Sequence, residues 1–338
     1  MLKVGIVGAS GYTGTELLRL CATHPEFEVV AATGESMAGT RLCDLYPNLA
    51  PAYGDLTYRV YDPADFVGLD VVVMGLPHGT SQPIVAELLG KVGVVADMGA
   101  DFRLDEPALY DEWYGAPHTC PDLLPEMIYG LPELFREQLV GARGIAVPGC
   151  NPTAACLAMA PFTKQGLLDG GPVIVDIAAG VSGAGRGPKA HTQFCAVDEN
   201  YEAYGILTHR HTPEMEQVLG APVLFQPHLA PMNRGILATC YARPAEAMSS
   251  QDALAAMAGF YADEPFITVD ERSPSTKATM GSNQVHMTAR VDPRTGTLLA
   301  IAAIDNLTKG SAGGAIQSIN IAMGLPETMG LPQIGLLP

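Results

Sequence analysis

The chain has 338 residues, enough for a large core and for two domains, and 48% of them are hydrophobic, as is ordinary for a soluble globular protein. Its formal net charge of −17 argues against nucleic acid as a partner, because phosphates would be repelled. No apolar stretch is long enough to span a bilayer, and seven cysteines without CxxC pairing favour a reducing cytoplasm over a disulfide framework.

A strand is predicted at Leu2–Val7, followed by a glycine-rich turn and an amphipathic helix that ends near Cys21. Because the first eight residues already form a strand and a turn, we expect no signal peptide. Three glycines in the turn permit a tight bend, close approach of the backbone to a pyrophosphate, and close contact between helix and strand. The pattern predicts a dinucleotide site that includes Gly8, Ser10, Gly11, Tyr12, Thr13 and Gly14.

Further βα units follow this first one. Strands are predicted at 27–33, 56–61, 70–77 and 93–97, and a helix is predicted near 81–89. Strands that alternate with helices predict a Rossmann-type, doubly wound parallel sheet, whose ligands lie beyond the carboxyl ends of the strands. We therefore expect the loop after the 70–77 strand to contact the cofactor through Leu76, Pro77, His78 and Gly79.

The end of the second strand leaves the choice of cofactor open. Glu35 would suit the ribose 2′-hydroxyl of NAD, whereas Ser36 and Arg41 would suit the 2′-phosphate of NADP.

Cys150 follows a short buried strand at 144–147 and a Pro148-Gly149 turn, and it precedes a predicted helix. Asn151 is a good N-cap residue, and Pro152 suits the first helical position. A thiol at such a helix start lies near unpaired amide donors and the positive end of the helix dipole, which favour the nucleophilic thiolate. The alternative is a small buried hydrophobic residue, as most free cysteines are.

The pattern changes after Cys150, and we place a domain boundary there. Residues 1–149 form the predicted dinucleotide domain, joined by a C-terminal segment at 310–338 with an amphipathic helix at 311–323. Residues 150–309 form an α+β catalytic and dimerisation domain with a mixed, largely antiparallel sheet. Its predicted strands are 172–179, 223–227, 235–243, 266–270, 283–291 and 298–304, with a hairpin turn at 292–296.

Two histidines separated by one residue are candidates for acid–base chemistry. In an extended segment His209 and His211 project to the same side, with Arg210 opposite, and a short helix capped by Thr212 follows. An imidazole near a thiol exchanges protons close to neutral pH. We expect no metal, because a His-x-His pair lacks a third and a fourth ligand at suitable spacing.

Basic residues in two other segments are candidates for binding an anionic group. The glycine-rich stretch 180–189 carries Arg186 and Lys189, and Arg103 follows a strand end. Arg103 could instead form a surface ion pair, and Arg234 could be purely structural. A reactive thiolate beside a nicotinamide suggests that an acyl phosphate is converted to a thioester and then reduced to an aldehyde.

The chain resembles the N-acetyl-gamma-glutamyl-phosphate reductases of arginine biosynthesis, in the semialdehyde dehydrogenase superfamily, over nearly its whole length. The motifs that carry the resemblance are Gly8–Leu17, Leu76–Gly79, Ala100–Leu104, Tyr129–Glu133, Pro148–Cys150, Val181–Arg186, His209–Glu214, Pro231–Thr239 and Ala303–Leu307. The resemblance implies NADPH-dependent reduction of N-acetyl-L-glutamyl 5-phosphate to N-acetyl-L-glutamate 5-semialdehyde, with release of phosphate.

The resemblance also implies roles for particular residues. Cys150 would be the nucleophile, and one of His209 and His211 would be the acid/base while the other orients the substrate. The family's preference for NADP favours the phosphate-binding role of Ser36 and Arg41. The resemblance further implies a cytoplasmic homotetramer or homodimer. It places Ser182, Gly183 and Asn306 at the cofactor and Asn151 at the substrate.

One residue departs from the family's pattern, which usually has an aromatic residue directly after the nucleophile. Asn151 is similar to the polar residue of related reductases in the aminoadipate route to lysine. Those relatives act on a substrate carried by a small acidic protein, which a surface at −17 would repel. The alternatives are a reductase of aminoadipyl or aspartyl phosphate, a non-catalytic NADP-binding regulator and a cysteine hydrolase, and the hydrolase leaves the dinucleotide domain unexplained.

Overall fold

The computed structural model of the chain describes all 338 residues, which form two compact units. The first unit comprises Met1–Pro148 and Ser311–Leu331, and the second comprises Gly149–Gly310 and Pro332–Pro338. The C-terminal segment expected to join the first domain is therefore split, because residues 332–338 belong to the second unit. The amide of Leu336 donates to the Met280 carbonyl there. No helix is both long and apolar enough to cross a membrane.

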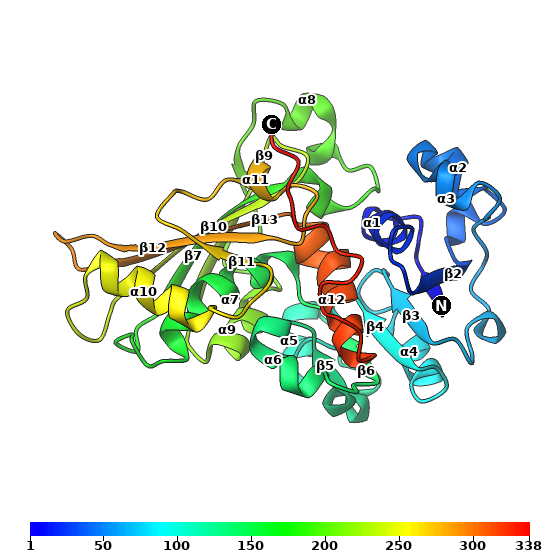
Figure 1. Cartoon of the computed structure of the whole chain (residues 1–338), viewed down its shortest axis with the longest axis horizontal. Coiled ribbons are helices and arrows are strands. Elements are labelled where there is room, and N and C mark those ends of the chain that lie inside the picture. The colour runs from blue at the N-terminus through cyan, green and yellow to red at the C-terminus, as the bar shows by residue number, and fades with distance from the viewer. The chain divides into compact units, whose positions relative to one another are not determined.

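The first unit contains a six-stranded parallel sheet in the order β2-β1-β3-β4-β6-β5 (Figure 1), which confirms the predicted doubly wound sheet. The strands are β1 Leu2–Val7, β2 Phe27–Ala32, β3 Val71–Met74, β4 Val94–Asp97, β5 Met127–Tyr129 and β6 Gly144–Ala146. The chain runs from β1 to β2 on one side and then returns to β3 on the other. The carboxyl ends of β1 and β3 therefore form the switch point where such sheets bind ligands.

The helices of the first unit are α1 Tyr12–Cys21, α2 Leu42–Leu45, α3 Ala50–Tyr53, α4 Gln82–Leu88, α5 Ala108–Tyr114, α6 Pro132–Leu139 and α12 Gly313–Ala322. The prediction that the last of these is amphipathic is wrong, because every residue of α12 is buried. Its polar side chains are satisfied inside the unit. The Ser318 hydroxyl donates to the Gly130 carbonyl, and the Gln317 amide donates to Glu133 and Glu327.

The strand predicted at 56–61 is also wrong. This segment forms only two isolated bridges, one between Arg59 and Thr33 and one between Thr57 and Arg41. Its backbone bonds are divided between the end of β2 and residues 39–42, so no continuous ladder forms.

The second unit contains a seven-stranded mixed sheet in the order β11-β12-β13-β10-β7-β9-β8, which confirms the predicted architecture. Its strands are β7 Val173–Gly180, β8 Glu202–Ala203, β9 Val223–Ala230, β10 Ile236–Ala242, β11 Ile267–Val269, β12 Val285–Val291 and β13 Leu298–Ile304. The pairs β10–β13, β10–β7, β12–β13 and β8–β9 are antiparallel, whereas β7–β9 and β11–β12 are parallel.

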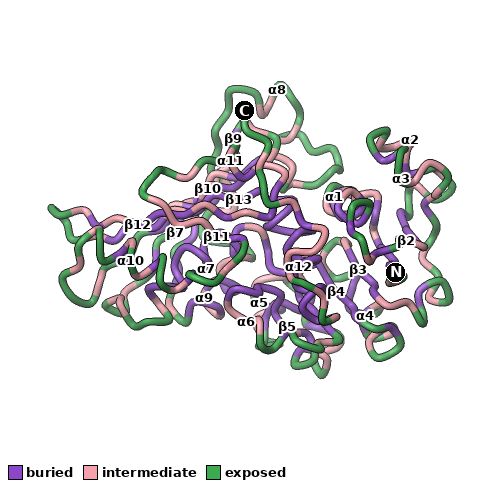
Figure 2. The backbone as a smooth tube through the Cα atoms, viewed as in Figure 1, coloured by how far each residue is buried: buried purple, intermediate pink, exposed green.

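Helices cover one face of this sheet, and the core lies beneath them. The helices of the unit are α7 Cys150–Thr163, α8 Phe194–Val197, α9 Thr212–Leu219, α10 Ser250–Phe260 and α11 Thr276–Thr279. Figure 1 shows α7, α9 and α10 on one side of the strands, and Figure 2 shows the buried course of α7. Residues 151–162 of α7 are all buried, because the helix packs on the sheet and is flanked by α9 and α10.

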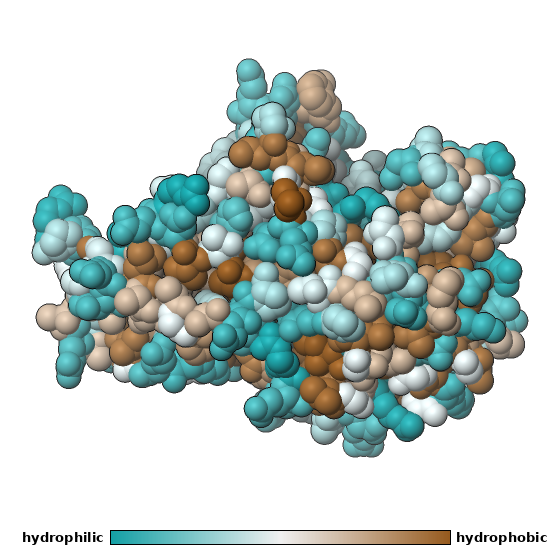
Figure 3. Space-filling model, viewed as in Figure 1, coloured by the Kyte–Doolittle hydropathy of each residue, from teal (hydrophilic) through white to brown (hydrophobic).

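The other face of the sheet carries exposed apolar residues. Ile174 on β7 pairs in register with Leu224 on β9 and with Tyr241 on β10, and their exposed fractions are 42%, 46% and 38%. Hydrophobic residues also gather in Figure 3 over the C-terminal tail, where Ile334, Leu336 and Leu337 are exposed.

Candidate active site

The predicted glycine turn lies at the switch point of the first unit. Gly8 has φ +82°, and a Cβ there would lie 2.6 Å from the carbonyl oxygen of Gly75, in the loop after β3. A Cβ at Gly14 would lie 2.6 Å from the Cα of Ala9. The start of α1 has no side-chain cap, so its first amides remain available to an anion. These close contacts explain why the turn requires glycines, and its contact with the cofactor stays a prediction.

Two other predicted cofactor segments occupy the same unit. The loop after β3 turns at Gly79, which has φ +86°, and the Gly79 amide donates to Asp101. Arg41 is exposed and pairs with Asp44 at 2.6 Å, and the carboxylate of Glu35 accepts the Tyr61 amide at 3.4 Å. The exposed Arg41–Asp44 pair is of the kind that contributes little to stability, and the role of Arg41 at the 2′-phosphate stays a prediction.

The nucleophile candidate lies at the first residue of α7. Gly149 is the N-cap, in extended conformation and without a side-chain cap, so the helix begins earlier than Asn151, which was the predicted N-cap. The reason is that the Gly149 carbonyl already accepts the Thr153 amide at 2.9 Å. Cys150 is partly exposed at this uncapped start, where the helix dipole favours a thiolate.

Three other cysteines, Cys21, Cys156 and Cys240, are buried, and their thiols stay protonated and unreactive. Burial raises the pKa of Cys21 and of Cys240 to about 12 and raises that of Cys156 as well. None of these three lines the cavity into which Cys150 opens.

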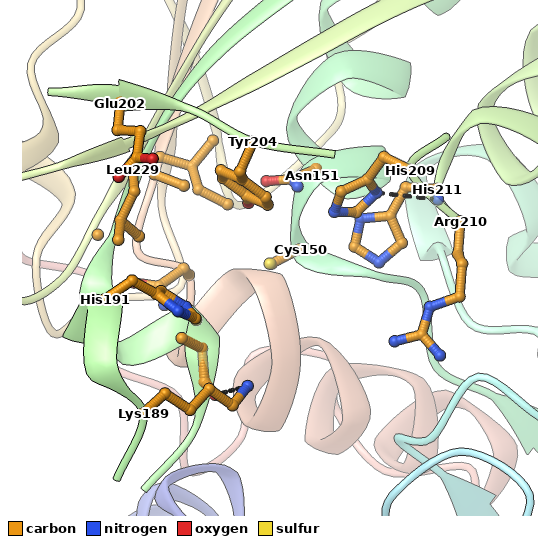
Figure 4. Close-up of a pocket in the computed structure, with 16 residues that line it drawn as sticks. Cys150, Asn151, Lys189, His191, Glu202, Tyr204, His209, Arg210, His211 and Leu229 are labelled. Atoms are coloured by element: carbon orange, nitrogen blue, oxygen red, sulfur yellow. Dashed lines mark hydrogen bonds between the residues drawn. The ribbon is translucent and has the colours of Figure 1, made fainter. Parts of the chain in front are cut away.

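A cavity of about 580 Å³ lies entirely within the second unit and contains the Cys150 side chain (Figure 4). In Figure 4 the two imidazoles of His209 and His211 lie on one side of the Cys150 sulfur, and Lys189 and His191 lie on the other. The predicted site residues that line the cavity are Cys150, Asn151, Gly183, Lys189, His209, His211 and Asn306. Ser182 does not line the cavity itself, but its hydroxyl accepts a hydrogen bond at 3.0 Å from the side-chain amide of Asn306, which does.

The rings of His209 and His211 are neighbours, with centroids 4.6 Å apart. The predicted extended segment is wrong, because residues 209–212 form a turn closed by the Thr212 amide on the His209 carbonyl, with His211 rather than Thr212 as the N-cap of α9. Arg210, predicted on the opposite side, lines the same cavity. The Nδ1 atom of His209 accepts the His211 backbone amide at 3.1 Å, so the neutral ring carries its proton on Nε2. Burial, and then the charge of Arg210, lower the pKa of His209 to about 4. At neutral pH His209 is therefore an uncharged hydrogen-bond donor through Nε2.

A buried carboxylate ties the nucleophile to the helix that follows the histidines. Glu214 lies in the first turn of α9, is fully buried, and accepts the Gly149 amide at 2.8 Å. A Cβ at Gly149 would collide with the ring of His211. The turn before Cys150 and the His211 ring are therefore fixed against each other by direct contact.

Two of the predicted anion-binding residues do not line this cavity. Arg186 is exposed and does not line it. Arg103 belongs to the first unit, where its buried guanidinium donates to the carbonyls of Met98 and Val147. Arg234, for which the sequence allows a purely structural role, donates two hydrogen bonds to Asp305, both at 2.9 Å.

Three residues near Cys150 were missed by the sequence analysis. Burial, and then the nearby Cys150, raise the pKa of Tyr204 to about 12, and its hydroxyl is bonded to Asn151. A Cβ at Gly310 would lie 2.8 Å from the Cβ of Cys150. Glu214 could have been found as an acidic residue in the first turn of a helix. Tyr204 and Gly310 carry no local signal, because only tertiary packing brings them to Cys150.

Comparison with known proteins defines the class to which this fold and cavity belong. The family described as "semialdehyde dehydrogenase, NAD binding domain" matches residues 3–142, and "semialdehyde dehydrogenase, dimerisation domain" matches residues 150–306. The chain belongs to the semialdehyde dehydrogenase family.

Its curated relatives are more specific. The chain is 48% identical over 343 residues to N-acetyl-gamma-glutamyl-phosphate reductase of Symbiobacterium thermophilum, covering 99% of this chain and 98% of the relative. It is 45% identical over 347 residues to the protein of the same name in Desulforudis audaxviator, covering both chains fully. These matches confirm the family resemblance seen in the sequence motifs.

Solved structures with a similar fold are more distant in sequence. Aspartate semialdehyde dehydrogenase with NADP from Candida albicans has a TM-score of 0.72 and 17% identity, covering 96% of this chain and 99% of that chain. Aspartate semialdehyde dehydrogenase II from Vibrio cholerae has a TM-score of 0.70 and 16% identity, covering 96% and 98%. At these identities the likeness concerns the fold.

Proposed function

We propose that the chain reduces N-acetyl-L-glutamyl 5-phosphate to N-acetyl-L-glutamate 5-semialdehyde with NADPH, releasing phosphate. Support comes from full-length relatives that carry the name of this reductase and from the dinucleotide domain of the first unit. The observation that carries the proposal is the position of Cys150 at an uncapped helix start, open to a cavity that also contains two histidines.

In the first step the Cys150 thiolate attacks the acyl carbon, and the bond from that carbon to the phosphate oxygen breaks. A thioester forms on sulfur, and phosphate leaves with the electron pair. His211 is assigned as the group that gives phosphate its proton, because His209 has a pKa of about 4 and holds no second proton at neutral pH. Lys189 and Arg210 line the cavity and offer positive charge to the departing phosphate.

In the second step bound NADPH would supply the hydride that reduces the thioester carbon. The carbonyl oxygen becomes an alkoxide, and the Nε2–H of His209 donates a hydrogen bond to it. When the alkoxide collapses, the carbon–sulfur bond breaks, the aldehyde is released and the thiolate of Cys150 is restored. Over both steps one hydride and one proton are consumed, and the proton ends on phosphate.

The reverse reaction tests this proposal. N-acetylglutamate semialdehyde, NADP⁺ and phosphate should give NADPH absorbance that requires phosphate and vanishes in Cys150→Ala. Cys195→Ala is the matched control, because Cys195 is exposed and does not line the cavity. Absence of signal with every aldehyde, despite measurable binding of the nucleotide, would contradict the proposal and support a regulator.

Aminoadipyl and aspartyl phosphates are the alternative substrates, and Asn151 is the residue that makes them worth testing. The Asn151 side chain is 2% exposed and its Oδ1 atom has no hydrogen-bond partner, so the polarity of residue 151 bears directly on what the cavity binds. Signal only with the aminoadipate analogue, or only with aspartate semialdehyde, would transfer the assignment to that acyl phosphate.

We also propose that the chain is a homo-oligomer of the cytoplasm. The exposed apolar residues Ile174, Leu224 and Tyr241 are adjacent on the uncovered sheet face and would suit an interface between copies. All seven cysteines are free, which suits a reducing compartment. Light scattering of Ile174→Asp should show smaller particles than the wild type, whereas equal masses would contradict this interface.

A further inference from the structure

A line of polar groups, three of them fully buried, lies behind the loop after β3 in the first unit. It comprises Asp97 at the end of β4, Ser81 at the N-cap of α4, Asp101 in the loop after β4, and His78. The Ser81 hydroxyl oxygen lies 2.8 Å from Oδ2 of Asp97 and 2.7 Å from Oδ2 of Asp101. Oδ1 of Asp101 lies 2.6 Å from Nδ1 of His78. Ser81, Asp97 and Asp101 have no exposed surface.

Hydrogen counting assigns the protons in this line. A serine hydroxyl has one hydrogen and can donate it to one carboxylate only, so the other carboxyl group must itself donate to the hydroxyl oxygen. Asp101 accepts the amides of Gly79 and Ser81 at 2.7 and 3.0 Å and also faces His78, which stabilises its charged form. Apart from its contact with Ser81, Asp97 accepts one backbone amide only, that of Gly99. Asp97 is therefore the carboxyl group that holds the proton.

The electrostatics of the surroundings agree with this assignment. Burial, and then the charge of Asp101, raise the pKa of Asp97 to about 6, against the lowering effects of its hydrogen bonds and of Arg103. The other titratable groups that face the line are His118, Tyr110 and Tyr114. The His118 ring lies 2.7 Å from the Asp101 carbonyl, and burial lowers its pKa. Burial raises the pKa of Tyr110, and Tyr114 packs on the His78 ring with centroids 4.2 Å apart.

Asp101 controls the shape of the loop that the sequence analysis assigned to the cofactor. It holds the His78 side chain, the Gly79 amide and the Ser81 amide at once, around the left-handed residue Gly79. The same loop begins at Gly75 and Leu76, which contact the position of Gly8 in the glycine turn. The conformation of the loop is therefore set by the carboxylate of Asp101, which is fully buried.

We propose that Asp101 and Asp97 are positioning residues for NADP(H): Asp101 holds the loop Leu76–Gly79 in its binding conformation, and the proton on Asp97 keeps the Ser81 hydroxyl directed to Asp101. This rests on the proposed function and on the cofactor contact that the sequence predicts for that loop. When Asp97 loses its proton, two buried carboxylates compete for one hydroxyl hydrogen and repel each other. The loop then loosens, and affinity for NADPH falls as the pH rises above about 6.

Asp97→Asn separates this effect from the titration of the nucleotide's own phosphate. An asparagine amide donates to Ser81 at any pH, while its oxygen still accepts the Gly99 amide. The dissociation constant for NADPH is measured with the full-length protein by energy transfer from Trp113, the single tryptophan of the chain, which lies on α5. The ratio of the wild-type constant to the Asp97→Asn constant should rise by about tenfold between pH 6 and pH 8. A ratio that stays constant over this range would overturn the role of Asp97.

Asp101→Asn should weaken NADPH binding by about tenfold or more at every pH, with kcat at saturating NADPH within about threefold of the wild type. If Asp101→Asn does not fold, Ser81→Ala tests the same line of polar groups. Asp70→Asn is the control, because Asp70 accepts the Lys3 amide and lies outside that line. Wild-type affinity in both Asp101→Asn and Ser81→Ala overturns the proposal. If the wild type reduces its substrate while these variants bind normally, only this inference fails. If the wild type binds no NADPH, the proposed function fails with it.

Discussion

The carboxylate of Glu214 accepts the amide hydrogen of Gly149 at 2.8 Å, and this bond joins the residue before the nucleophile to the helix that follows the two histidines. Both partners are buried. The position of Cys150 relative to His211 therefore depends on a contact between two residues that do not line the cavity.

Glu214→Ala should lower both stability and turnover. It leaves the buried Gly149 amide without its acceptor, which costs about 1–3 kcal/mol of unfolding free energy. Chemical denaturation measures the stability loss, and steady-state assays should show kcat reduced by about tenfold or more with an unchanged KM for NADPH. Glu214→Gln retains an acceptor oxygen and should recover most of the activity. If Glu214→Gln is as impaired as Glu214→Ala, the carboxylate acts by its charge rather than by this bond.

Gly149→Ala should inactivate the protein by displacing His211. The added methyl group would overlap the imidazole, so the ring must leave its present position in the cavity wall. Gly259→Ala is the matched control, because a methyl group at this position in α10 meets no atom within 4 Å. That change should leave activity intact and stabilise the helix by about 0.5–1 kcal/mol. Equal activity of the two variants would mean that the Gly149–His211 contact has no role.

Asn151→Ala should weaken binding of the acyl phosphate without affecting NADPH. The Oδ1 atom of Asn151 is buried in the cavity wall without a partner, and a substrate donor would satisfy it. The expected result is a KM for the acyl phosphate raised by about tenfold, since a lost hydrogen bond of this kind is worth about 1–1.5 kcal/mol. An unchanged KM would remove Asn151 from the substrate site.

Stability should fall on acidification because of His209. Its pKa is lowered from 6.5 to about 4, so between these values the unfolded chain takes up a proton that the folded chain does not. This contribution is fully present above pH 6.5 and is lost as the pH falls towards 4, by about 3 kcal/mol at most. Urea unfolding at pH 7.5 and pH 5 should show a larger loss for the wild type than for His209→Asn. Equal losses would show that His209 titrates normally in the folded state.

Much of this architecture follows from local sequence. The glycines at 8 and 14 are required by backbone contacts that no side chain could enter, and β13 occupies the predicted residues 298–304. The rings of His209 and His211 are neighbours, as the one-residue spacing predicted, although the segment forms a turn rather than the predicted extended stretch. At Gly14 the constraint acts within a few residues of the motif, whereas at Gly8 it comes from the positive φ and from Gly75 in the loop after β3.

The incorrect predictions concern segments whose structure depends on residues far away in the sequence. An apolar segment at 56–61 was predicted as a strand, but whether it pairs depends on distant residues, which give it only isolated bridges. α12 contains polar residues that suggest an exposed face, yet buried partners far along the chain satisfy them. Tyr204 and Gly310 reach Cys150 in the same way, through packing that no local pattern encodes.

Peptide mass spectrometry of the protein mixed with the acyl phosphate in the absence of NADPH tests the thioester most directly. The mechanism predicts an N-acetylglutamyl adduct on the Cys150 peptide, absent from Cys150→Ala and retained in Cys195→Ala. Continued turnover without any adduct at Cys150, or an adduct confined to another cysteine, would contradict it.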